Sequence, residues 1–82
     1  MAAFADRLKE LRQVSNVKQT VIAEMLGIVP RTVRFYESGK LEPNIENIKR
    51  LADFFGVSTD YLMGRTNYWV DADGNIKTKE EL

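Results

Sequence analysis

The sequence predicts an all-α domain of five short helices with a short C-terminal β-hairpin. Three observations support this prediction. Apolar residues recur at helical spacing as far as Leu62, each break carries glycine, proline or a capping side chain, and β-prone runs begin only after Thr66. A chain of 82 residues has room for one modest core. We therefore expect residues 1–65 to form the helical domain and residues 66–82 a hairpin or tail.

The first helix is predicted from one apolar face and a polar stop at Asn16. Its apolar residues lie three or four positions apart: Phe4, Leu8, Leu11 and Val14. A second helix is expected over residues 18–26. It is followed at once by Gly27, which enters the left-handed cap conformation without strain. A third helix is expected over residues 30–38, since Pro30 suits a first helical position.

The fourth and fifth helices have recognisable starts. Asn44 can cap the fourth helix by accepting a free backbone N–H, and Gly56 ends it. Its apolar residues are expected to form a buried stripe: Ile45, Ile48, Leu51, Ala52 and Phe55. Ser58 caps a short fifth helix that carries Tyr61 and Leu62 and ends at Gly64.

The last residues indicate a hairpin. Residues 67–70 and 75–78 are β-prone and flank the turn sequence Asp71-Ala72-Asp73-Gly74. An isolated hairpin is only marginally stable, so it should pack on the helices or on another chain. We expect residues 79–82 to be frayed. The acidic turn lacks the ligand spacing and closing glutamate of a calcium loop, so no metal site is expected.

Composition excludes several classes of function. The chain has no cysteine and no histidine, which removes disulfides, thiolate metal sites and the commonest general base. No apolar run approaches the roughly 20 residues that span a bilayer. The N-terminus is charged and helix-periodic, unlike a signal peptide. We expect a cytoplasmic protein with no cofactor, no membrane contact and no small-molecule ligand.

The distribution of charge permits binding to nucleic acid although the net charge is zero. Through Arg65 there are ten Lys and Arg against eight Asp and Glu, and after it two against four. Arg31, Arg34 and Lys40 concentrate positive charge in one short stretch. DNA binding requires a basic face rather than a basic average.

The segment from Gln19 to Ser38 predicts a helix-turn-helix. Two helices that meet steeply through a short turn need a small residue at their contact and glycine in the turn. Ala23 and Gly27 satisfy these needs. Apolar residues must fill the angle from both sides, and the chain supplies Ile22, Leu26, Ile28, Val33 and Tyr36.

On these residues the chain from about Phe4 to Gly64 resembles the Cro/repressor-type helix-turn-helix family, also called the XRE family. FADRLKELR, ESGKLEP and LADFFGVSTDYL extend the match. The resemblance implies a five-helix fold that binds operator DNA as a homodimer, with the third helix in the major groove. RTVRFYESGKLEP is also similar to MerR-type regulators. Those proteins have a β-hairpin wing soon after the motif and no amphipathic helix before it, so the repressor-type interpretation is favoured.

The resemblance assigns roles position by position. Gln19 matches a phosphate-binding glutamine, and Lys18 beside it can add a charge at the same helix N-terminus. Lys40 and Asn44 match further phosphate contacts. The face that reads bases comprises Arg31, Thr32, Arg34 and Phe35, with Arg31 able to pair with both acceptors of guanine. Arg12 and Glu37 match a structural ion pair.

The chain also departs from the family pattern. Val29 and Pro30 stand where the family usually has a capping Ser or Thr and a polar base-contacting residue. Readout of the sequence must therefore depend on Arg31, Arg34 and Phe35, or on DNA shape. The bland alternative is that these charges form only a solvated helix face.

Two uses are open for the aromatic tail. Trp69 and Tyr68 can cover the domain's own core near Tyr61, or build a dimer interface with Val70 and Ile76, which we favour. The alternative function is an antitoxin-like or other interaction module whose tail binds a partner protein. The chain can also be the N-terminal piece of a longer repressor. An enzyme is the remotest alternative, because the carboxylates are scattered without a pocket signature. Repression by occupying a promoter is the simplest mechanism.

Overall fold

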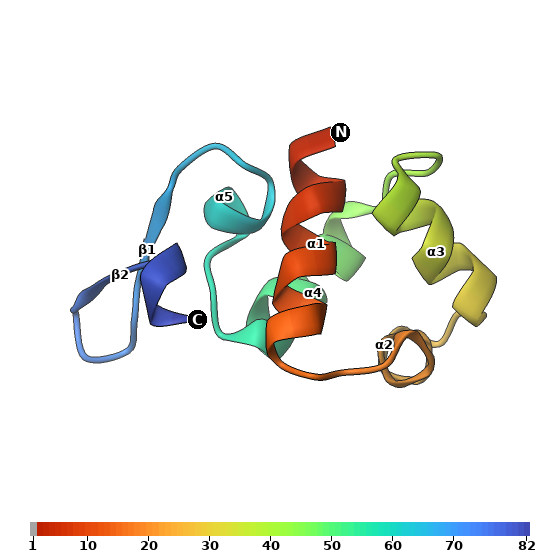
Figure 1. Cartoon of the computed structure of the whole chain (residues 1–82), viewed down its shortest axis with the longest axis horizontal. Helices are drawn as coiled ribbons and strands as arrows, with labels where there is room; N and C mark the ends of the chain where they lie inside the picture. The colour runs from red at the N-terminus through yellow and green to blue at the C-terminus, as the bar shows by residue number, and fades with distance from the viewer. Residues whose placement is uncertain (1) are drawn as a thin grey trace.

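The computed structural model describes residues 2–82, which form five α-helices, a two-stranded antiparallel sheet and one 3₁₀ turn. This confirms the predicted fold class. The molecule measures 35 × 21 × 21 Å, with α3 at one end and the hairpin at the other (Figure 1). The elements are α1 Ala2–Val14, α2 Gln19–Leu26, α3 Pro30–Ser38, α4 Ile45–Phe55, α5 Thr59–Leu62, β1 Tyr68–Val70, β2 Ile76–Thr78 and η1 Lys79–Glu81.

A single core lies around α1, which packs on α3 on one side and on α5 on the other. The rings of Phe4 and Tyr36 meet edge to face with centroids 6.3 Å apart, which joins α1 to α3. The fully buried large side chains come from all five helices: Phe4, Leu8, Leu11, Ile22, Val33, Leu51, Tyr61 and Leu62. Burial of these apolar surfaces is the main stabilising contribution to the fold.

The predicted helix caps are confirmed. The Asn44 side chain accepts a hydrogen bond from the Asn47 N–H at 2.8 Å, and the Ser58 hydroxyl accepts one from the Tyr61 N–H at 3.0 Å. Gly64 is required for a second reason besides its positive φ of 80°. A Cβ at this position would overlap the Cβ of Ala3, so glycine allows the end of α5 to approach α1.

Four details of the predicted helices are wrong. α2 begins at Gln19, and Lys18 before it has extended backbone. Val14 is 54% exposed and Ile45 is 77% exposed, although both share a spacing with buried residues. Both lie in the terminal turn of their helices, beyond the reach of the core. Phe55, at the other end of the stripe in α4, is only partly buried.

The hairpin forms with Tyr68 opposite Thr78, Trp69 opposite Lys77 and Val70 opposite Ile76. The Asp71 carboxylate accepts the N–H groups of Asn75 and Asp73 across the turn, both at 2.9 Å. These hydrogen bonds, that of Asn75 foremost, hold the pKa of Asp71 below its ordinary value.

Trp69 is the residue by which the hairpin packs on the helices. It is only 7% exposed, and its ring centroid lies 4.7 Å from that of Tyr61. The expectation that Trp69 belongs to a dimer interface is therefore wrong, because it covers the domain's own core. Alternation along a strand leaves its neighbours Tyr68 and Val70 exposed on the opposite face.

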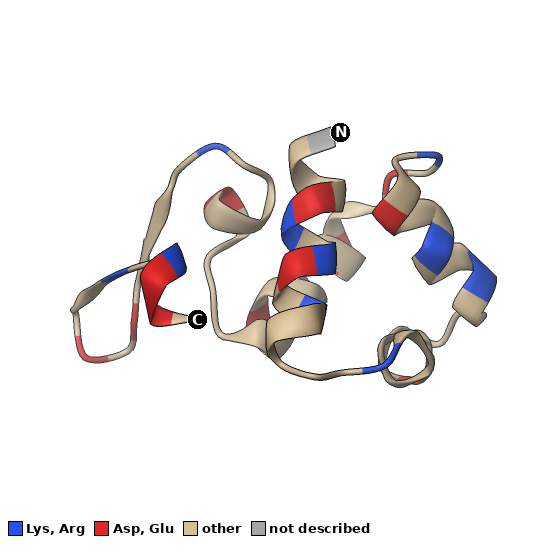
Figure 2. Ribbon diagram, in the orientation of Figure 1, with Lys and Arg blue, Asp and Glu red and all other residues tan. Residues whose placement is uncertain are grey.

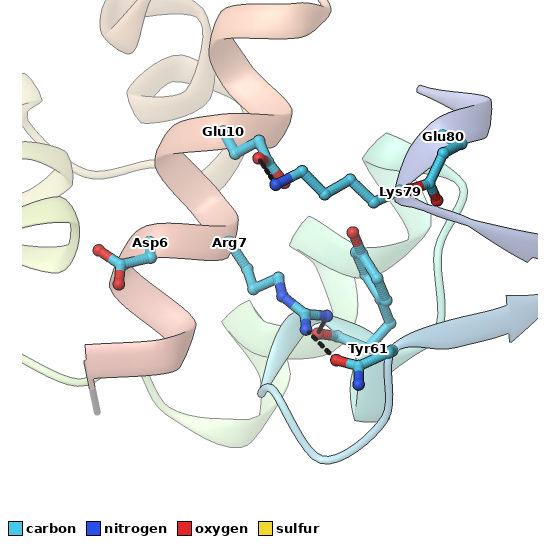
Figure 3. A pocket seen from close by; sticks show the side chains of 7 residues that line it. Asp6, Arg7, Glu10, Tyr61, Lys79 and Glu80 are labelled. Atoms are coloured by element: carbon cyan, nitrogen blue, oxygen red, sulfur yellow. Dashed lines mark hydrogen bonds and ion pairs between the residues drawn. The ribbon is translucent and has the colours of Figure 1, made fainter.

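Polar contacts fasten the tail to α1. The Arg7 guanidinium lies 4.0 Å from the centroid of the Tyr61 ring (Figure 3). It donates hydrogen bonds to the backbone oxygens of Tyr61 and Thr66 at 2.8 and 3.0 Å, and to the Asn67 side chain at 2.9 Å. Lys79 pairs with Glu10 at 3.2 Å. Residues 79–81 are thus a 3₁₀ turn held by an ion pair, and the expected fraying is wrong for them.

Candidate nucleic-acid interface

The helix-turn-helix is built as the sequence predicts. α2 ends at Gly27, whose φ of 71° lets the chain turn, and the Ile28 N–H donates back to the Ala23 oxygen at 2.9 Å. Ala23 is buried where α2 meets α3, with Ile22 and Val33 beside it in the core. The small side chain of Ala23 permits close approach of the two helices, which fixes the direction in which α3 projects.

α3 presents a basic outer face with a half-buried aromatic ring beside it. Arg31 and Arg34 are exposed, whereas Thr32 and Phe35 are partly buried. The expectation that all four lie on the exposed face is therefore met only in part. The Lys40 ammonium lies 5.2 Å from the centroid of the Phe35 ring, close enough for a cation–π interaction. Lys40 is thereby held near the C-terminal end of α3.

The first turn of α2 is free of a capping side chain. Lys18 occupies the cap position with extended backbone, and its side chain makes no capping hydrogen bond. The N–H groups of a helix's first turn carry partial positive charge and favour an anion. Lys18 therefore adds a full positive charge to a helix end that already suits a phosphate.

Arg12 and Glu37 form the predicted ion pair, with two parallel bonds of 2.6 and 3.0 Å. The Glu37 side chain is 6% exposed and that of Arg12 17% exposed. The hydrogen bond to Glu37 raises the pKa of Arg12, against the effect of partial burial. Arg12 also donates to the Val17 oxygen at 3.2 Å, which ties α1 to the segment before α2.

Gln19 belongs to the same network. Its amide nitrogen donates to Glu37 at 3.1 Å. A carboxylate can only accept, so this bond determines which way the Gln19 amide faces and leaves its second N–H available to another acceptor. Gln19 is thus oriented at the start of α2, beside Lys18.

Positive charge gathers on α3 and immediately before α2, while the acidic residues of the turn and tail lie at the far end (Figure 2). Within residues 2–82, Lys18, Arg31 and Arg34 have no ion pair. The basic side chains at the opposite end form ion pairs: Lys77 with Asp71 at 3.9 Å, Lys79 with Glu10 at 3.2 Å and Arg65 with Asp60 at 4.0 Å.

Comparison with known proteins identifies the family. Residues 8–62 match the profile of the helix-turn-helix family. The chain is 35% identical over 79 residues to YonR, a prophage-derived HTH-type transcriptional regulator of Bacillus subtilis, covering 96% of this chain and 73% of YonR. This protein is an XRE-type helix-turn-helix regulator.

Solved structures place the same fold in several settings. A transcriptional regulator from Listeria innocua superposes with a TM-score of 0.73 at 43% identity, over 74% of this helix-turn-helix chain and 57% of that protein. The P22 c2 repressor in complex with a synthetic operator superposes with a TM-score of 0.69 at 26% identity, over 76% of this chain and 94% of that one.

The same helical unit also occurs inside an enzyme. Hydroxypropylphosphonic acid epoxidase from S. wedmorenis matches 74% of this helix-turn-helix chain but only 33% of its own length, with a TM-score of 0.68 and 31% identity. The family and the relatives of this chain are transcriptional regulators rather than enzymes. The epoxidase shares only this helical portion, and a shared fold does not imply a shared activity.

The structure also brings to the helix-turn-helix one residue that sequence analysis did not select. Lys9 of α1 lines a surface groove of about 350 Å³ together with residues of α1, α2 and α3: Arg12, Gln19, Arg34, Glu37 and Ser38. Lys9 stands three positions before Arg12, on the same face of α1. That spacing was the available signal.

The remaining predicted site residue of this helix-turn-helix region is Asn44, which is exposed. Its oxygen caps α4, so only its amide N–H groups are available to a phosphate. Elsewhere in residues 2–82, no group of three or more acidic, cysteine or histidine side chains is arranged to hold a metal ion. No helix in this range is long and apolar enough to cross a membrane.

Proposed function

We propose that this protein is a sequence-specific transcriptional regulator, acting by repression, that binds a near-palindromic operator as a homodimer with α3 in the major groove. The observation that carries the proposal is the outer face of α3. Arg31 and Arg34 project from it and have no ion pair within residues 2–82, beside the uncapped start of α2. The P22 c2 repressor, which has the same fold and was solved with a synthetic operator, supports the same function.

Two kinds of contact are proposed at this interface: contacts to base edges, which give sequence preference, and contacts to phosphates, which set the register. Arg31 reads a base edge, because a guanidinium can bond both acceptors of a guanine, and Arg34 and Phe35 lie beside it. Val29 and Pro30 have no side-chain donor, so these two positions make no hydrogen bond to a base, and DNA shape can add to the readout there. Phosphate contacts set the register, and they come from residues flanking α3: Lys18, Gln19, Lys40 and Asn44.

We place the homodimer contact on the outer face of the hairpin. The register puts Tyr68, Val70 and Ile76 on one face, all exposed, and α3 lies at the opposite end of the molecule (Figure 1). Two molecules 35 Å long joined in line would hold their α3 helices on the order of two DNA turns apart. A spacing of one turn, about 34 Å, requires the two long axes to form a V, with the hairpins at its apex and both α3 helices on the DNA, and this is the arrangement we propose.

Selection of preferred sites from a random duplex library tests the function. We expect a two-fold symmetric consensus with half-sites one helical turn apart. Half-sites two turns apart would agree with a sequence-specific regulator but would contradict the V-shaped dimer. Absence of enrichment at physiological salt would contradict sequence-specific binding altogether.

Substitution of Arg31 tests the base-reading role. Arg31→Ala should relax the preference at one base position and weaken binding to the preferred site by about 1–3 kcal/mol. The measurement is competition between the consensus duplex and single-base variants. Unchanged preference at every position would show that Arg31 does not read a base.

Lys40→Ala provides the contrasting case. It should weaken binding to all sequences alike and flatten the salt dependence, because a lysine at a phosphate carries no sequence information. A loss confined to one base position would contradict the phosphate role.

The second candidate function is an interaction module whose tail binds a partner protein. The exposed hairpin face of Tyr68, Val70 and Ile76 is the observation that favours it. The packing of Trp69 in the domain's own core favours the regulator, since a tail that wraps a partner would need to leave this position. Co-purification of a stoichiometric partner, together with no selection of DNA, would decide for the second candidate.

A further inference from the structure

We infer that Lys9 of α1 is an additional DNA-phosphate contact, which extends the interface beyond the helix-turn-helix itself. This inference rests on the proposed function. The groove that Lys9 lines is bounded by the oriented Gln19 of α2 and by Arg34 and Ser38 of α3. When α3 occupies the major groove of DNA, a DNA strand that passes the start of α2 runs along the protein groove that Lys9 lines.

The network beneath the groove leaves it positive. Glu37 is the only acidic residue of the lining, and it is already bonded by Arg12 and Gln19. Lys9 is exposed, and neither it nor Arg34 has an ion pair within residues 2–82. A second cleft, between α1 and the tail, is different. Its volume is about 420 Å³ and its lysine, Lys79, is paired with Glu10.

The chemistry of lysine favours a phosphate over a base edge at this place. An ammonium is a compact, strongly hydrated charge on a flexible stem, and it binds phosphate as a point charge. Lys9 lies on α1. In the proposed complex α3 occupies the major groove of the DNA and therefore stands between Lys9 and the base edges. A contact of this kind strengthens binding to every sequence and adds one phosphate to the footprint.

Salt dependence measures the contact directly. Lys9→Ala removes one phosphate contact from each subunit of the homodimer, so it should reduce the slope of log K against log salt concentration by about 1.8. Binding to a duplex of random sequence should then lose roughly twelvefold less affinity between 50 and 200 mM salt than the wild type loses. The base preference should not change. Lys9→Arg, which keeps the charge, should retain the wild-type slope.

The matched control is Lys77→Ala, which removes one positive charge from the hairpin at the far end from α3. If the two alanine variants change the slope equally, Lys9 acts only through net charge and the inference is overturned. Circular dichroism of both variants checks that the fold is kept.

Phosphate neutralisation locates the partner of Lys9. Each phosphate around one selected half-site is replaced in turn by an uncharged methylphosphonate. One replacement should weaken the wild type and leave Lys9→Ala unaffected, and it should lie next to the phosphate at the start of α2. Equal sensitivity of both proteins at every position would overturn the inference while leaving the regulator intact. Failure of the wild type to bind any duplex would instead overturn the proposed function, and the inference with it.

Discussion

The two ends of this molecule use their charged side chains differently. At the α2–α3 end, Arg31 and Arg34 are exposed and have no ion pair within residues 2–82. At the hairpin end, the Arg7 guanidinium donates hydrogen bonds to three acceptors and lies over an aromatic ring, and Lys79 is paired with Glu10. The first set is available to a partner, whereas the second fastens the tail to α1.

The hairpin end also has one exposed apolar face. The hairpin exposes Tyr68, Val70 and Ile76 on one face, although its other face is buried through Trp69. The difference teaches that net charge, here zero, says little about a small domain. Function follows from which charges remain unpaired after folding and where they lie.

The largest expected effect on stability comes from removing the packing of the hairpin on the helices. Trp69→Ala removes the ring that packs on Tyr61 and should lower the free energy of unfolding by about 3 kcal/mol. Urea unfolding followed by circular dichroism measures this. Tryptophan fluorescence is unsuitable, because Trp69 is the only tryptophan of the chain and the variant lacks it.

Tyr68→Ala is the matched control, because Tyr68 precedes Trp69 and faces outward. It should change the stability of the monomer by no more than about 0.5 kcal/mol. Equal losses in the two variants would show that both faces of the hairpin are buried in solution, which would revise the comparison of the two ends.

A smaller effect is expected from the ion pair beneath the α2–α3 end. Glu37→Ala leaves Arg12 without its partner in a partly buried position and frees Gln19. We expect a loss of stability of about 2 kcal/mol, below the cost of breaking a fully buried pair because Arg12 keeps some contact with solvent.

The exposed pair of Arg65 and Asp60 supplies the control for this substitution. Its atoms are 4.0 Å apart on the surface, so Asp60→Ala should cost less than about 1 kcal/mol. If Glu37→Ala costs no more than Asp60→Ala in thermal unfolding, the pair of Arg12 and Glu37 does not hold α1 against α3.

Much of this fold could be predicted from the sequence because its local signals agree with one another. Asn44 and Ser58 cap the helices that they were expected to cap, and Gly27 turns the chain between α2 and α3. The pair of Arg12 and Glu37 was predicted from the resemblance to the family. Capping and turn chemistry depend on a few neighbouring residues, so sequence is sufficient for them.

The wrong predictions concern how far tertiary contacts reach. Helical spacing placed Val14 and Ile45 on an apolar face, yet spacing does not tell where the core ends along that face. The ordered turn at residues 79–81 depends on Lys79 reaching Glu10, a contact across most of the chain. Lys9 was missed because its neighbours in the groove come from three helices.

The most direct test neutralises three charges at each end and compares DNA binding. One variant carries Arg31→Gln, Arg34→Gln and Lys40→Gln, and the other carries Arg65→Gln, Lys77→Gln and Lys79→Gln, so that net charge is equal. Since Lys79 also fastens the tail to α1, circular dichroism and sedimentation check that the second variant keeps its fold and its dimer. We expect the first variant to lose sequence-specific binding, and its slope of log K against log salt concentration to fall by about 2, because each subunit of the homodimer loses the phosphate contact of Lys40. The second should keep the preferred sequence and a slope within one unit of the wild type. Equal losses in both variants would contradict the claim that the α2–α3 end is the DNA-binding surface.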